Sequence, residues 1–87
     1  MTLEQLTGFS AYVKPQISGL NLPPRRVLLQ QFEDNAGWWT AECPSLPGCV
    51  SQGETPEQSL ESIKEAMELW LETALEAGEA VPASDSH

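Results

Sequence analysis

The stretch from Thr55 to Gly78 most constrains the fold, because it carries the signals for both ends of one long helix. Thr55 is a good N-cap residue, Pro56 suits the first helical position, and Gln58 completes a T-x-x-Q capping box. Gly78 is the residue type expected where a helix ends in a left-handed conformation. The sequence therefore predicts a helix from Pro56 to Ala77.

The predicted helix is strongly amphipathic. Its apolar residues recur at the three- and four-residue spacing of one helix face, which predicts that this face packs on another element. These residues are Leu60, Ile63, Met67, Trp70, Leu71 and Ala74.

Acidic residues form a second row on the polar side of the same helix. The row consists of Glu57, Glu61, Glu65, Glu68, Glu72 and Glu76. Like charges one turn apart destabilise a helix by a few tenths of a kcal/mol per pair, and Lys64 is the nearby residue that offsets them. Two interpretations stay open: a docking surface for a basic partner, or a solvated face built from a good helix former.

The residues before the helix predict an antiparallel sheet. Residues 25–34 are rich in strand formers, and D-N-A-G (34–37) is a suitable hairpin loop. In W-W-T-A-E-C (38–43), alternation places Trp39, Ala41 and Cys43 on one face, which we expect to lie under the helix. Trp38 then lies on the opposite face, either in an interface or beneath the N-terminal segment.

Two further short strands are expected. P-S-L-P-G (44–48) predicts a sharp turn, C-V-S-Q (49–52) a third strand, and E-A-V-P (79–82) a fourth strand at the sheet edge. Near-helical spacing of Leu3, Leu6, Phe9 and Val13 predicts a short helix, followed by a loop up to Pro24. The expected organisation is an N-terminal extension over 1–24, an α+β domain over 25–82 and a disordered tail over 83–87.

Charge and size restrict the class of partner. Thirteen acidic and four basic residues give a net charge of −9, which disfavours direct nucleic-acid binding because that requires basic contacts to phosphate. The charge favours a basic protein partner, or it simply maintains solubility. A chain of 87 residues has a modest core, so a homo-oligomer, a dimer or tetramer, is expected. Without a signal peptide or membrane-spanning pattern, we expect a cytoplasmic protein.

No constellation of residues indicates catalysis, so the expected sets of catalytic, cofactor-binding and metal-binding residues are empty. Cys43 and Cys49 lack the spacing of a zinc knuckle, and His87 is the only histidine. Packed reduced thiols are the simplest interpretation of the cysteines, and a redox switch across the turn is the alternative. The carboxylates near the strand ends would form a site only if two converged in a sheltered pocket; they are Glu33, Asp34, Glu42 and Glu54.

Four segments together resemble the HicB-like antitoxin family over residues 25–82. They read P-x-L-P-G-C, V-S-Q-G-E-T-x-E-x-S-L, I-K-E-A-M-E-L-W-L-E and G-E-A-V-P. The resemblance implies an α+β fold of order β-β-β-α-β, a degenerate RNase H-like arrangement with an antiparallel sheet and one long helix on one face. It also implies oligomerisation and binding to a HicA-like toxin, a small basic mRNA-cleaving protein whose active site the antitoxin occludes.

The sequence departs from the family pattern at both ends. Many members carry a DNA-binding module after this domain and use it to repress their own operon; none fits here, which puts autorepression in doubt. The N-terminal 24 residues have no counterpart in the minimal domain. The motif residues Pro44, Leu46, Pro47, Gly48 and Gly53 are interpreted as structural.

The expected function is therefore that of a type II antitoxin. The candidate partner-binding residues are Trp38, Glu61, Glu65, Glu68 and Glu72. The alternative is an orphan oligomeric domain, structural or regulatory, without a toxin partner.

Overall fold

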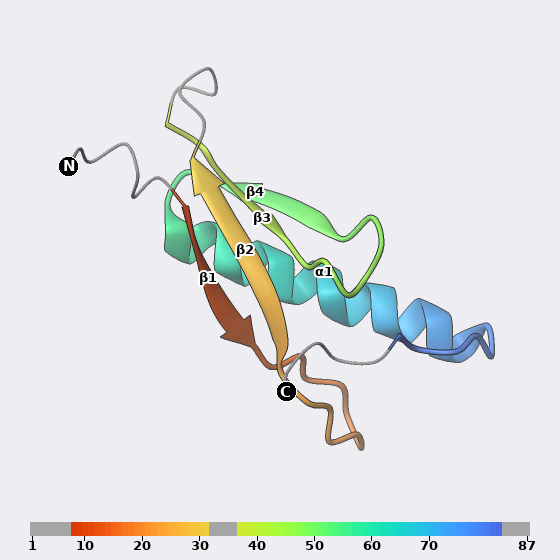
Figure 1. Cartoon of the computed structure of the whole chain (residues 1–87). Helices are drawn as coiled ribbons and strands as arrows, with labels where there is room; N and C mark the ends of the chain where they lie inside the picture. The colour runs from red at the N-terminus through yellow and green to blue at the C-terminus, as the bar shows by residue number, and fades with distance from the viewer. Residues whose placement is uncertain (1–7, 32–36, 83–87) are drawn as a thin grey trace.

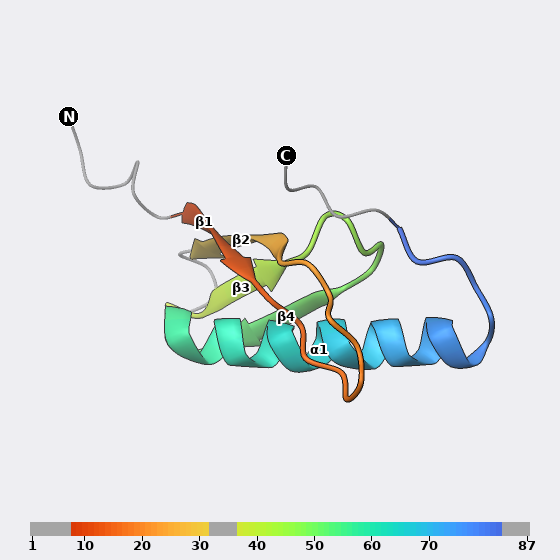
Figure 2. The same ribbon diagram turned by 90° about the horizontal axis from the view of Figure 1, so that it is seen from below.

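The computed structural model describes residues 8–31 and 37–82 and shows two layers, a four-stranded sheet and one helix (Figure 1). The elements are β1 (Gly8–Val13), β2 (Arg25–Gln31), β3 (Trp39–Glu42), β4 (Val50–Gly53) and α1 (Pro56–Glu76). The sheet is antiparallel throughout, with the order β1-β2-β3-β4. The helix covers one face of the sheet, as the edge-on view shows (Figure 2). The predicted α+β fold is confirmed.

The core lies between α1 and the facing side of the sheet. Leu29 of β2 pairs with Phe9 of β1 on one side and with Ala41 of β3 on the other, so these residues share the helix-facing side. Because the helix lies over this side, the burial of Leu29 and Ala41 drives the association of the two layers. The buried apolar residues are Val27, Leu29, Ala41, Cys43, Leu46, Cys49, Ile63, Met67, Leu71 and Ala74.

The N-terminal segment corrects one prediction. Residues 8–13 form the edge strand β1, not part of a short helix; residues 1–7 of that predicted helix lie outside the described residues. Phe9, Ala11 and Val13 alternate with Ser10 and Tyr12 on one face of β1; Ala11 and Val13 pack against the core, whereas Phe9 stays 46% exposed. The ring of Phe9 also meets the ring of Trp39 edge-on, with centroids 5.7 Å apart. Long-range pairing has overridden the local helical spacing.

The segment after the helix corrects a second prediction, because residues 79–82 are not a strand. The outer edge of β2 pairs with β1 instead. The segment is held by Arg25, which is buried and donates hydrogen bonds to the Pro82 carbonyl and, over 2.8 Å, to Ser45 Oγ. Val81 packs against the core. The predicted tail over 83–87 lies outside the described residues, as does most of the predicted hairpin loop over 34–37.

Both ends of α1 agree with the prediction. Thr55 Oγ1 accepts a hydrogen bond of 3.1 Å from the Gln58 N–H. The Gln58 side chain reaches back one residue further than in a standard capping box and accepts from the Glu54 N–H at 2.9 Å. At the other end, Gly78 adopts a φ of 73° and so ends the helix as expected.

The turn over 44–48 is also confirmed. The Cys43 N–H donates to the Cys49 carbonyl over 3.0 Å, and Leu46 fills the turn from within as a fully buried side chain. Gly48 has a φ of 80°, the left-handed region in which other residues are strained. The turn is therefore anchored in the core through Leu46. Within the described ranges, no helix is long and apolar enough to cross a membrane.

Candidate protein-binding surfaces

The acidic row lies on the side of α1 opposite the sheet. Glu61, Glu65 and Glu72 are exposed, while the buried helix residues lie on the other side of the helix. The last turn of the helix contains no basic residue to balance the carbonyl end of the helix dipole. The row therefore presents negative charge to solvent along most of the helix.

Glu68 differs from the other members of the row because it has partners within the chain. Its Oε2 accepts a hydrogen bond of 2.7 Å from the Gln16 N–H and lies 3.9 Å from Lys64 Nζ. This contact fixes the β1–β2 connection against the side of the helix, and the connection crosses α1 in the edge-on view (Figure 2). Glu68 thus has a structural role that its position in the row did not reveal.

Trp38 is 40% exposed and lies just before β3. Its neighbour Trp39 pairs with Gly53 and packs against the core, so the two tryptophans differ in burial as alternation predicts. Gly53 approaches the first turn of α1. The helix α1 begins at this end of the sheet and extends away from it. Trp38 therefore lies near the first turn of α1, whereas Glu72 lies near the last turn. The candidate partner-binding residues do not form one compact cluster.

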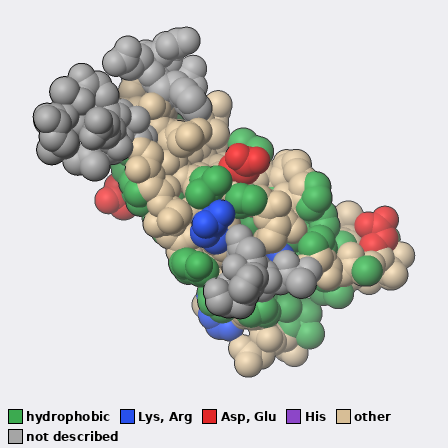
Figure 3. All heavy atoms as spheres, viewed as in Figure 1, with side chains coloured by type: hydrophobic (Ala, Val, Ile, Leu, Met, Phe, Trp, Pro, Cys, Tyr) green, Lys and Arg blue, Asp and Glu red, His purple; other side chains and the backbone are tan. Residues whose placement is uncertain are grey.

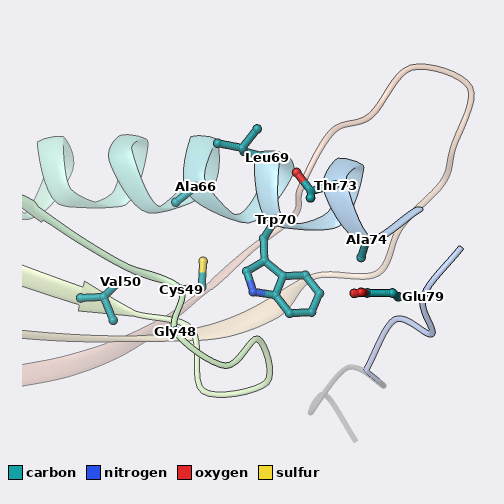
Figure 4. Close-up of a pocket in the computed structure, with 9 residues that line it drawn as sticks. All are labelled: Gly48, Cys49, Val50, Ala66, Leu69, Trp70, Thr73, Ala74 and Glu79. Carbon is teal, nitrogen blue, oxygen red and sulfur yellow. The ribbon is translucent and has the colours of Figure 1, made fainter. Parts of the chain in front are cut away.

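A groove that the sequence did not reveal lies between α1 and the start of β4 (Figure 4). Its volume is about 430 Å³, within the range of binding pockets. Trp70 forms one wall and is fixed by a hydrogen bond of 3.0 Å from its Nε1–H to the Pro47 carbonyl. The lining residues are Gly48, Cys49, Val50, Ala66, Leu69, Trp70, Thr73, Ala74 and Glu79.

Two apolar residues of this groove are strongly exposed. Leu69 is 66% exposed and Val50 is 50% exposed. The sequence contained a signal for Leu69, because it falls outside the apolar stripe and beside glutamates of the acidic row. Trp70, which was expected in that stripe, is only partly buried and flanks the core.

The sheet face away from the helix is mixed in character. It carries the exposed Tyr12 and Val50 together with Arg26 and Glu42. The view onto this face shows hydrophobic side chains between polar and charged ones (Figure 3). Charged residues thus interrupt its apolar area.

The two cysteines are free and buried. Burial raises the pKa of the Cys49 thiol from 9.0 to about 11, and the neighbouring Cys43 adds to the rise. Glu33 and Asp34, two of the four carboxylates considered for catalysis, lie outside the described residues. Within the described part of the chain, no three His, Cys, Asp or Glu side chains gather as a metal site would require.

Comparisons with known proteins give a consistent result. Residues 26–87 match the family described as HicB_like antitoxin of bacterial toxin-antitoxin system. A UPF0150 protein of Synechocystis sp. is 42% identical over 59 residues, which cover 68% of this chain and 72% of the relative. A UPF0150 protein of Thermoplasma acidophilum is 33% identical over 54 residues, which cover 62% of this chain and 78% of the relative. No solved structure matches the chain with comparable significance.

Proposed function

The chain belongs to the HicB-like antitoxin family, and from this membership we propose that it neutralises a small basic HicA-like toxin by binding it and covering its mRNA-cleaving site. Family membership supports an antitoxin-type role. We propose that the chain performs this role by binding its partner. The observation that carries the finer proposal is the exposed acidic row on α1, with Glu61, Glu65 and Glu72 facing solvent.

Electrostatics supports the choice of a basic protein. A net charge of −9 on 87 residues attracts a positively charged partner and accelerates its encounter. The same charge opposes direct binding of nucleic acid by this chain. We place the partner contact at Glu61, Glu65 and Glu72, with Trp38 at the end of the sheet as an aromatic contact. Glu68, which holds Gln16, contributes to the negative potential of the same surface.

The test is inhibition of the HicA-like toxin from the same genome. The purified chain should suppress mRNA cleavage by that toxin at stoichiometric amounts, and the affinity should fall as salt rises, because screening weakens contacts between exposed charges. The double variant Glu61→Lys/Glu65→Lys should bind at least about tenfold more weakly. The control Glu42→Lys/Glu54→Lys changes the net charge equally at exposed positions outside the helix. Equal losses in both variants would remove the helix surface from the proposal.

Self-association is the second candidate, and the sheet edges favour it. Among residues 8–31 and 37–82, no strand pairs with the outer edge of β1 or of β4. Open edges are ready sites for pairing with another chain. We propose a homodimer or tetramer in the cytoplasm, which sedimentation equilibrium would detect. An orphan domain would self-associate and leave every HicA-like protein of its genome active.

A further inference from the structure

We propose that the groove between α1 and β4 is the docking site of the basic partner, and that it receives an apolar side chain flanked by Lys or Arg. This assignment rests on the proposed function and names the surface through which it acts. The groove is lined mainly by apolar residues. The two most exposed are Leu69, on the outer side of α1 (Figure 4), and Val50, whose side chain lies on the sheet face away from the helix, so both border the groove from its rim. Large apolar side chains that stay exposed beside a cavity mark a surface that gains by being covered.

The acidic row supplies the charge around the groove. Leu69 lies one turn after Glu65 and one turn before Glu72, so both glutamates border its exposed side. Glu79 lines the far end of the groove (Figure 4). None of the four basic residues of the chain is among the described lining residues. An apolar floor with an acidic rim is complementary to an apolar side chain with basic neighbours.

The edge of β4 offers backbone hydrogen bonds along the same groove. The Cys43 N–H donates to the Cys49 carbonyl, so Cys49 and Ser51 direct their backbone groups toward β3. The alternate residues Val50 and Gln52 consequently direct theirs away from β3, toward the open edge. An extended partner segment can add to this edge while its side chain enters the groove.

The two walls of the groove are joined to each other in the free protein. The Trp70 indole is bound to the Pro47 carbonyl, which ties the helix wall to the turn before β4. Leu46 anchors that turn in the core. A pocket that exists in the free protein needs little ordering on binding, so more of the contact energy appears as affinity.

A second copy of this chain fits the groove less well. Each copy has a net charge of −9, and a copy seated here would bring further negative charge against Glu65, Glu72 and Glu79. A basic partner removes that repulsion. We therefore expect the groove to bind a basic partner, and self-association through the groove would contradict this assignment.

The test compares two leucines of the same helix. Leu69→Gln changes an exposed residue of the groove, whereas the control Leu75→Gln changes an exposed residue outside its lining. Both substitutions leave the net charge unchanged, and glutamine forms helices about as well as leucine does. With the purified HicA-like toxin as the probe, Leu69→Gln should raise the Kd about tenfold and Leu75→Gln less than about twofold. Unchanged thermal unfolding would show that both variants are folded.

Three other results would overturn the assignment, and they are distinguishable. Tight binding by the wild type with equal affinities for both variants would reject the groove and leave the proposed function intact. No binding of any HicA-like toxin by the wild type would reject both. A change in the oligomeric state of Leu69→Gln, measured by sedimentation with toxin binding unchanged, would assign the groove to self-association.

Discussion

Replacing Gly53 with alanine should destabilise the protein strongly, because the end of β4 touches the first turn of α1. A Cβ atom at Gly53 would lie 2.4 Å from the Ser59 nitrogen and 2.8 Å from the Gln58 carbonyl carbon. Both atoms belong to the helix backbone, so no side-chain rotation relieves the contact. The two layers would have to separate locally, or the first turn would have to shift.

The expected cost has two contributions. Overpacking a close contact costs about 1–3 kcal/mol. A shift of the first turn also disturbs the Thr55 cap, which contributes about 1 kcal/mol, and the hydrogen bond from the Ser59 N–H to the Thr55 carbonyl. We expect a loss of about 2–4 kcal/mol in the free energy of unfolding. For a domain of this size that loss lowers Tm by roughly 10–25 °C.

Urea titration, followed by far-UV circular dichroism and tryptophan fluorescence, measures this loss. Gly48 is the matched control, because a Cβ there has no atom within 4 Å but the φ is left-handed at 80°. Gly48→Ala should therefore cost about 1–2 kcal/mol through the backbone alone. Asparagine tolerates the left-handed region, so Gly48→Asn should recover stability relative to alanine, whereas Gly53→Asn should be worse than Gly53→Ala. A loss below about 1 kcal/mol for Gly53→Ala would refute the steric argument.

Three further predictions concern the walls of the groove and the C-terminal segment. Trp70→Phe should lower the free energy of unfolding by about 1 kcal/mol in urea titration, because the hydrogen bond to the Pro47 carbonyl is lost. Trp70→Ala should lower it further, but by less than the roughly 3–5 kcal/mol typical of a fully buried aromatic residue, because Trp70 is only partly buried. Equal losses for both variants would show that this hydrogen bond accounts for the whole effect. At pH 8 native Cys49 should react with iodoacetamide about a hundredfold more slowly than an unperturbed thiol, because its pKa is raised to about 11. Between pH 9 and 11 the thiol ionises in the unfolded chain but not in the folded one, so the stability that it contributes should fall over this range. Fast labelling at pH 8 would contradict the burial of Cys49. Arg25→Met should release residues 79–82 and increase their proteolysis, and an unchanged cleavage rate would show that other contacts hold them.

The helix and the central hairpin were predictable because local chemistry determines them. Thr55, Pro56 and Gly78 mark the ends of α1 through backbone requirements that depend little on the rest of the chain. The alternation of Trp39, Ala41 and Cys43 identified the buried face of β3 in the same way. Where the local signals agreed with each other, the structure agreed with them.

The N-terminal strand was not predictable because two periodicities compete in the same residues. Phe9 and Val13 fit a helical spacing with residues upstream, yet Phe9, Ala11 and Val13 also fit the alternation of a strand. Pairing with β2 selects the strand over the helix. This pairing joins two segments that are separated in the sequence, so the local pattern of residues 8–13 does not predict it. The same limit applies to Glu68, whose hydrogen bond with Gln16 spans 52 positions of the chain.

The groove could not be predicted from the sequence either, because its two walls come from elements that are separate in the chain. The sequence separately indicated a rigid turn over 44–48 and an amphipathic helix, and each prediction is confirmed. The hydrogen bond from Trp70 to Pro47 joins them at a fixed spacing. A substitution that loosens the turn should therefore weaken partner binding as well as stability, even when it contacts no partner. For this reason, affinities of turn variants must be compared at matched folded fractions before any loss is assigned to a binding contact.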